Sequence, residues 1–212
     1  MVKILFIRHG YSKANELDLF LGYGNMDLTK IGLNQAKSLA NYLKDIHIDA
    51  IYSSDLDRTI QTATPTAKIK NLPIILDRGL REIYAGKWEY MPFTEIEKTY
   101  PEDWHSFCHG IDGGRCTGGE SFVDTQNRFY NTVLYLSKKN ENKTIAIFSH
   151  ATTIKGFVTK LKNLSAIETV KHPLPSNCSV TSVVYDNGKF TIEEYSKDDF
   201  MDTKTSLEQF NK

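Results

Sequence analysis

Short apolar runs alternate with helical patterns along most of the chain. Runs of β-branched and aromatic residues are typical of buried strands and lie at 4–7, 48–52, 73–76 and 144–148. Apolar positions at helical spacing predict helices at 29–43, 56–69, 93–100, 120–139 and 152–163. This alternation predicts an α/β fold: a three-layer sandwich in which helices cover both faces of a mostly parallel sheet.

Local signals set the limits of two of these helices. Thr29 is a suitable N-cap for the first helix. Its expected inward face comprises Leu33, Ala36, Leu39, Ala40 and Leu43. Pro65 is expected to kink or interrupt the helix over 56–69, because proline lacks the amide hydrogen and clashes with the preceding turn.

The last part of the chain carries a turn signal and a polar end. Asn187-Gly188 lies between the β-rich runs 179–185 and 189–195. Asn-Gly in this position predicts a hairpin, which adds at least one antiparallel strand. Residues 198–212 are polar, and we expect a frayed, partly helical tail there.

The least regular stretch is 101–119, which has five glycines and few aliphatic residues. We expect a long loop there, and we expect residues 90–118 to act as a cap or specificity loop. The stretch holds residue types that can bind zinc, namely His105, Cys108, His109 and Cys116. Their spacing matches no common zinc finger, so we expect no metal at this cluster.

Length and charge limit the function classes. The 212 residues suit a single catalytic domain over 1–212. Lys plus Arg and Asp plus Glu both number 26, so the chain lacks the basic excess of a nucleic-acid-binding protein. No apolar run is long enough to span a bilayer, and the first residues lack a signal peptide's apolar segment. We therefore expect a cytoplasmic protein without nucleic-acid or membrane partners. The sequence leaves the oligomeric state open.

Polar side chains follow each of the four predicted parallel strands. Those with reactive or phosphate-binding chemistry are Arg8, His9, Arg58, Arg81, Glu82 and His150. In open parallel sheets, ligands bind outside the carboxyl ends of the strands. We therefore expect these side chains to converge on one pocket.

The chemistry of this set favours phosphoryl transfer. Guanidinium groups match phosphate oxygens bidentately, a histidine nitrogen can accept a phosphoryl group, and a carboxylic acid can protonate a leaving alkoxide. The sequence contains no P-loop motif, which argues against Mg-nucleotide chemistry of that type. It also lacks a G-x-G-x-x-G motif after the first strand, which argues against a dinucleotide-binding fold.

An ordered set of motifs runs from residue 4 to about 158. It comprises Arg8-His9-Gly10 with Ser12 and Asn15, Gly22, Asp27-Leu28-Thr29, Ser53-Ser54-Asp55-Leu56 with Arg58-Thr59, Glu82, Gly86, Trp88-Glu89, Gly118-Gly119-Glu120-Ser121 and Ser149-His150. In this order the motifs resemble the histidine phosphatase superfamily, the phosphoglycerate mutase-like family.

The resemblance implies a role for each matching residue. His9 would be the nucleophile that becomes phosphohistidine, and Glu82 would be the general acid and later the base. Arg8, Arg58 and His150 would hold the phosphate. Further substrate contacts are expected from Asn15, Leu21, Gly22 and Ala151. Members of the family use no metal and no organic cofactor in this step, so we expect none here, and we expect a small phosphorylated substrate.

Three functions fit the resemblance. Mutases carry basic residues where this chain has Leu19 and the run Glu82-Ile83-Tyr84-Ala85-Gly86. Without those cations a doubly phosphorylated intermediate would bind weakly, so the sequence favours a phosphatase over a cofactor-dependent phosphoglycerate mutase. The third alternative is a non-catalytic module that binds phosphate ligands. The intact set of reactive residues argues against it.

Overall fold

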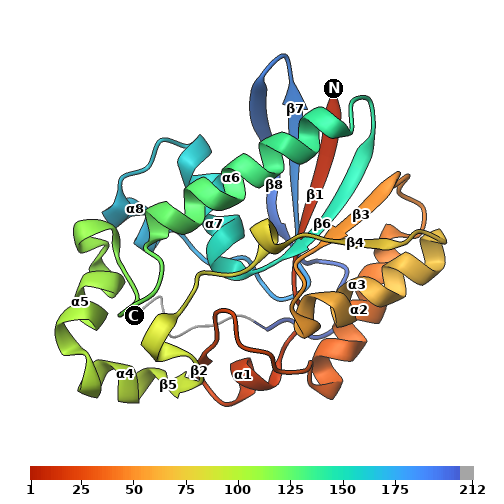
Figure 1. Cartoon of the computed structure of the whole chain (residues 1–212). Coiled ribbons are helices and arrows are strands. Elements are labelled where there is room, and N and C mark those ends of the chain that lie inside the picture. Colours follow the sequence, from red (N-terminus) through yellow and green to blue (C-terminus); the bar gives the residue numbers. More distant parts are fainter. Residues whose placement is uncertain (206–212) are drawn as a thin grey trace.

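The structure is a computed structural model that describes residues 1–205. In these residues, six strands form the main sheet in the order β4-β3-β6-β1-β7-β8. They are β1 (Val2–Arg8), β3 (Ala50–Ser53), β4 (Ile74–Leu76), β6 (Thr144–Ser149), β7 (Val180–Asp186) and β8 (Lys189–Lys197). Neighbours from β4 to β1 pair in parallel, whereas β7 runs antiparallel to β1 and β8. The predicted mostly parallel sheet with an antiparallel hairpin is confirmed (Figure 1).

Helices cover both faces of this sheet. One face packs against α2 (Lys30–Leu43) and α3 (Asp57–Lys70), and the other against α6 (Phe122–Lys139) and α7 (Ala151–Leu161) (Figure 1). Successive residues of β1 point to opposite faces, so Leu5 belongs to one buried cluster with Leu39, and Phe6 to the other with Phe129. These two cores confirm the three-layer sandwich.

The prediction of a long loop over 101–119 is wrong. Residues 101–109 form the helix α5 (Pro101–His109), which follows α4 (Phe93–Thr99) and precedes a 3-10 turn at Ile111–Gly113. Pro101 begins α5 because the first turn needs no amide hydrogen there, and Gly110 ends it with φ 64. The glycines therefore mark the turns that follow a helix.

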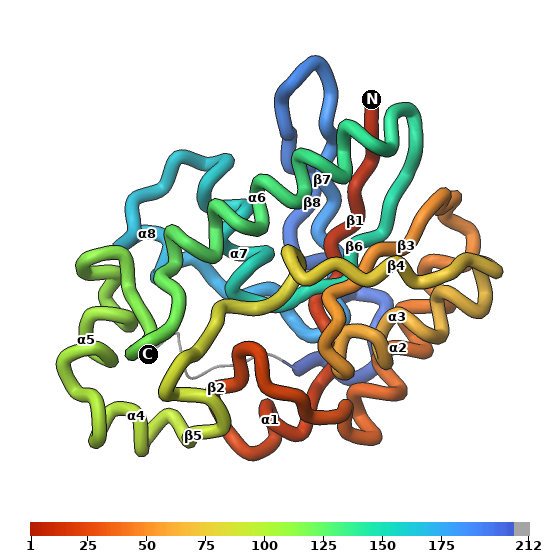
Figure 2. The backbone as a smooth tube through the Cα atoms, viewed as in Figure 1, coloured from red at the N-terminus to blue at the C-terminus, as the bar shows by residue number. Residues whose placement is uncertain are grey.

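The segment over 90–118 lies beside the carboxyl ends of the strands. Its short strand β5 (Met91–Pro92) pairs antiparallel with β2 (Leu19–Phe20). Trp88, Ile96 and Phe107 form the centre of a third buried cluster. Figure 2 shows α4 and α5 at the end of the molecule opposite the β7–β8 turn. A role of residues 90–118 in specificity stays a prediction.

Three further differences separate the expected elements from the observed ones. The helix α3 continues through Pro65, because its buried face packs against the sheet and outweighs the local cost. Leu33 is 44% exposed, and Gln35 takes the inward position instead. The short helices α1 (Lys13–Glu16) and α8 (Ala166–Lys171) lack a long apolar pattern and were not expected.

The described part of the predicted tail, 198–205, contains no helix. Phe200 stacks on Tyr42 with 4.1 Å between the ring centroids, and the Gln35 side-chain amide donates to Thr203 O and Thr205 Oγ1. Apolar and polar contacts thus fix this segment on α2. The remaining part of the predicted tail lies outside the described residues. In residues 1–205 no helix is long and apolar enough to cross a membrane.

Candidate active site

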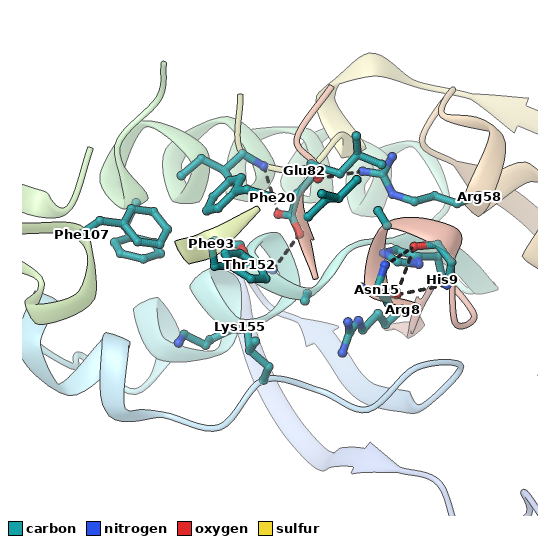
Figure 3. A pocket seen from close by; sticks show the side chains of 18 residues that line it. Arg8, His9, Asn15, Phe20, Arg58, Glu82, Phe93, Phe107, Thr152 and Lys155 are labelled. Atoms are coloured by element: carbon teal, nitrogen blue, oxygen red, sulfur yellow. Dashed lines mark hydrogen bonds between the residues drawn. The ribbon is translucent and has the colours of Figure 1, made fainter. Parts of the chain in front are cut away.

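One pocket at the carboxyl ends of the strands holds most of the predicted site. Arg8, His9, Arg58 and Glu82 line it, and the His150 ring lies 5.4 Å from the His9 ring. The predicted contacts Asn15, Leu21 and Ala151 also line this pocket. Gly22 does not line it; its carbonyl accepts a hydrogen bond from Arg58 Nη2 at 2.8 Å. Figure 3 shows Arg8, His9 and Asn15 on one side, with Glu82 across from them.

Two buried arginines supply positive charge. Each is 1% exposed, and both donate to neutral carbonyls: Arg8 to Pro175 O at 2.6 Å and Arg58 to Gly24 O at 2.8 Å. Within residues 1–205 neither forms an ion pair within 4.0 Å. Burial lowers the pKa of each to about 10. Because carbonyls do not neutralise their charge, the arginines favour an anionic ligand.

The His9 ring is held in the tautomer that a nucleophile needs. Its Nδ1 lies 2.8 Å from the carbonyl of Gly10, which can only accept, so Nδ1 carries the hydrogen. The lone pair is then on Nε2. Burial, together with the positive charges of Arg58 and Arg8, places the pKa of His9 well below 6.5. The ring is therefore neutral, with a nucleophilic nitrogen, at neutral pH.

His150 lies beside His9 but is fully buried and is not among the residues that line the pocket. It is the N-cap residue of α7, and its Nε2 lies 2.9 Å from Ser54 Oγ. Its pKa is also lowered, first by burial and then by Arg58 and His9. His150 Nδ1 and Arg8 Nε are both buried without a hydrogen-bond partner. Buried polar atoms rarely stay unpaired, and Arg8 lines the pocket, where a phosphate oxygen can accept from its Nε.

Backbone amides and an arginine hold Glu82. Its carboxylate accepts from Ile83 N at 3.0 Å and from Thr152 N, in the first turn of α7, at 3.1 Å (Figure 3). Arg128 donates to the Glu82 carbonyl at 2.9 Å. The Glu82 side chain lines the pocket, and its carboxylate forms no ion pair with Arg8 or Arg58 within 4.0 Å. This position suits proton transfer at the edge of the phosphate site.

The other acidic residues near the pocket have structural partners. Asp55 forms a bidentate ion pair with Arg81, at 2.6 Å for both contacts. Glu89 accepts from the backbone amides of Gly22, Tyr23 and Gly24. Neither lines the pocket, and within the described part of the chain Glu82 is the acidic side chain that does.

Trp88 and the cluster of zinc-compatible residues belong to the packing of the region over 90–118. Trp88 is fully buried and donates from Nε1 to Thr117 Oγ1 at 3.0 Å. The rings of His105 and His109 stack at 4.1 Å, and Cys116 is buried in the third core cluster. Among the described residues, no three His, Cys, Asp or Glu side chains come together as possible ligands.

Several site residues were missed from the sequence. Asn177 donates from Nδ2 to His9 O at 3.0 Å and to Asn15 Oδ1 at 3.3 Å. Asn15 thus uses its oxygen on protein groups, and its amide nitrogen can donate to a ligand. Thr62 Oγ1 accepts from Gly10 N, and Thr152 and Lys155 line the pocket. Only their position after a strand end could have indicated Thr152 and Lys155.

The buried histidines predict a pH-dependent stability. In the unfolded chain their pKa returns to about 6.5, so below that pH the unfolded state binds protons that the folded state does not. The free energy of unfolding therefore decreases as the pH is lowered below about 6.5, by at most about 1.4 kcal/mol per pH unit for each histidine. We expect a lower Tm of the ligand-free protein at pH 5.5 than at pH 7.5, and a smaller difference in His9→Gln and His150→Gln. An unchanged difference in both variants would contradict neutral buried rings.

Comparison with known proteins identifies the family. The family model of the histidine phosphatase superfamily (branch 1) matches residues 4–198. Phosphoserine phosphatase 1 of Hydrogenobacter thermophilus is 34% identical over 161 residues, 76% of each chain. A probable phosphoglycerate mutase of Proteus mirabilis is 30% identical over 188 residues, 88% of this chain and 86% of that protein.

Solved structures agree with the sequence matches. A mutant phosphoserine phosphatase from Entamoeba histolytica, in complex with phosphoserine, superposes with a TM-score of 0.86 at 29% identity, over 95% of this chain and all of the other. The chain belongs to the histidine phosphatase superfamily, as its motifs indicated. The match to this family and to phosphatases within it confirms the predicted class, a phosphomonoester hydrolase.

Proposed function

We propose that the protein hydrolyses a small phosphomonoester through a phosphohistidine at His9. One observation carries this proposal: the free Nε2 of a neutral His9 shares a buried pocket with Arg8 and Arg58. Such a pocket binds a phosphate dianion next to a nucleophile. Turnover of p-nitrophenyl phosphate tests the proposal, because a module that only binds phosphate ligands would release no nitrophenolate.

In the first step His9 Nε2 attacks phosphorus and forms an N–P bond as the P–O bond to the alcohol breaks. Glu82, in its protonated form, gives its proton to the departing alcohol oxygen. Arg8, Arg58, His150 and the Asn15 amide hold the three non-bridging oxygens, where negative charge is spread in the transition state.

In the second step Glu82, now a carboxylate, takes a proton from a water molecule. The water oxygen attacks phosphorus and the N–P bond breaks. Inorganic phosphate leaves, and His9 Nε2 regains its lone pair. The reaction thereby returns both side chains to their starting state.

We propose a phosphatase rather than a mutase for this pocket. Among residues 1–205, the cationic side chains that line it are Arg8, Arg58 and Lys155, and Leu19 lines the wall where mutases are expected to carry a basic residue. These described cations are too few to hold a second phosphate dianion. Incubation with 3-phosphoglycerate separates the two activities: we expect release of phosphate, whereas formation of 2-phosphoglycerate would indicate a mutase.

Relatives suggest which substrates to test first. Phosphoserine phosphatase structures from Entamoeba histolytica contain phosphoserine or 3-phosphoglyceric acid, and an adenosylcobalamin/α-ribazole phosphatase of Escherichia coli is 26% identical. We propose that the substrate is a phosphorylated metabolite. A single domain over 1–212, a cytoplasmic location, and the lack of nucleic-acid and membrane partners stay predictions from the sequence.

We expect that exhaustive treatment with EDTA leaves activity unchanged. Arg8 and Arg58 already supply the positive field that a metal ion would otherwise supply to the phosphoryl group. The measurement is p-nitrophenyl phosphate hydrolysis before and after chelation. A loss of activity that zinc or magnesium restores would contradict the metal-independent mechanism and direct attention to His105 and Cys116.

A further inference from the structure

Lys155 is a buried cation in the active-site pocket that the proposed phosphoryl transfer does not use. It lies on α7 and is only 5% exposed. Thr152, three residues earlier, lies on the same side of the helix, and both line the pocket. Figure 3 shows the Lys155 side chain apart from Arg8, His9 and Arg58, on the side toward Phe93 and Phe107. It therefore lines a part of the pocket away from the residues proposed to hold the phosphate.

The Lys155 ammonium has donors to spare. In the described chain its hydrogen bond is to the carbonyl of Val170 at 2.9 Å, and no carboxylate lies within 4.0 Å. Burial lowers the pKa of Lys155 to about 8, and the charge of Glu82 acts in the opposite direction. An ammonium carries three hydrogens, so a ligand can accept from the remaining two. A buried lysine with no ion pair is costly, and an anionic ligand would offset that cost.

The pocket that Lys155 lines is otherwise rich in apolar side chains. Phe20, Phe93, Phe107, Phe122 and Leu174 also line this pocket. Apolar walls lower the local dielectric and strengthen an ion pair within them. With Arg8 and Arg58 placed at the phosphate, Lys155 is the cation left for a second charged group among the described residues that line the pocket.

We propose that Lys155 binds a carboxylate on the alcohol part of the substrate, so that the enzyme prefers phosphorylated hydroxy acids over uncharged phosphorylated alcohols. This inference rests on the proposed phosphatase activity. A single ammonium matches the charge of one carboxylate, whereas a second phosphate dianion would need a further cation. The bond from Lys155 to Val170 also satisfies a carbonyl in the last turn of α8, so a purely structural role is the alternative.

Two substrates that differ in one group separate these roles. 3-Phosphoglycerate and glycerol 3-phosphate differ in having a carboxylate or a hydroxymethyl group. For the natural chain we expect kcat/KM to be on the order of 10- to 100-fold higher for 3-phosphoglycerate, the range for a hydrogen-bonded charge pair. Lys155→Met should abolish that preference, mainly through a higher KM for 3-phosphoglycerate, with a much smaller change in kcat/KM for glycerol 3-phosphate. Lys155→Arg should restore part of it.

The matched control is Lys160→Met, which removes a cation of the same helix whose Nζ bonds Asn127 outside the pocket. It should leave both substrates unchanged. Should Lys155→Met fold poorly, the natural chain tests the proposal by itself. The preference for 3-phosphoglycerate should decline as pH rises from 7 to 9, because Lys155 loses its charge in this range. Two other titratable groups interact with Lys155: the charge of Glu82 raises the pKa of Lys155, and the charge of Lys155 lowers the pKa of His172.

Three outcomes would overturn the proposal. Equal slowing of both substrates by Lys155→Met would mean a structural role at α8. Equal kcat/KM values for the two substrates in the natural chain would mean that the pocket does not bind the carboxylate. These results leave the phosphatase activity intact. If the natural chain hydrolyses neither substrate nor p-nitrophenyl phosphate, the proposed function fails, and this inference fails with it.

Discussion

His9→Ala is expected to lower the turnover of phosphomonoesters by on the order of 10³-fold or more, because no other group in the pocket can replace the nucleophile. The neutral ring, fixed by Gly10 with its lone pair on Nε2, shares the pocket with two buried arginines. Removal of the ring leaves phosphate binding by Arg8 and Arg58 in place. We therefore expect kcat to fall while inorganic phosphate still binds, as measured by steady-state kinetics and calorimetry.

His47→Ala is the matched control for this variant. The His47 side chain is 82% exposed and bonds Asp49 on the surface. This substitution should leave kcat and KM unchanged. Retention of more than a tenth of the activity by a folded His9→Ala protein would contradict the nucleophilic role.

Glu82→Gln is expected to slow alkyl phosphates by ~10²-fold more than p-nitrophenyl phosphate in the phosphorylation step, the usual scale of general-acid assistance. An alkoxide needs a proton to depart, whereas nitrophenolate leaves with little help. Glutamine keeps the size and one oxygen, so the amide contacts of Ile83 and Thr152 can be partly retained. Single-turnover rates are required, because Glu82 also activates water in the second step.

Equal slowing of both ester types would mean that Glu82 is not the leaving-group acid. Asp55 and Glu89 would be the next candidates by sequence. In the structure Asp55 is paired with Arg81, and Glu89 is bonded to the amides of 22–24. Either would have to break these contacts to reach a substrate. The double comparison of ester and variant therefore tests the placement of Glu82 directly.

The sequence predicted the sheet and the convergence of several candidate site residues because both depend on short local patterns. Buried parallel strands are continuous apolar runs, and β1 is buried at nearly every position. The carboxyl ends of such strands meet at one edge of the sheet, so Arg8, His9 and His150 could be placed together without knowledge of the loops. Arg58 and Glu82 followed from the same rule, although a short non-helical segment precedes Arg58 and a 3-10 helix precedes Glu82.

Tertiary contacts decided the parts that could not be predicted. The five glycines of 101–119 concealed α5, whose aromatic side chains are buried only after they pack with Trp88 and Phe20. Asn177 lies 168 residues from His9 in the sequence, and only the β7 side of the fold brings its amide to the His9 carbonyl. Lys155 has the sequence pattern of an ordinary helical lysine, and its burial depends on α8.

Trapping of the phosphorylated enzyme tests the central claim most directly. The protein would be mixed with 32P-labelled substrate and quenched in base within the first turnover, and the labelled residue would be located by peptide mapping. Our account predicts acid-labile, base-stable phosphate on His9 and none in His9→Ala. Phosphate on any other residue, or no covalent phosphate while turnover proceeds, would contradict it.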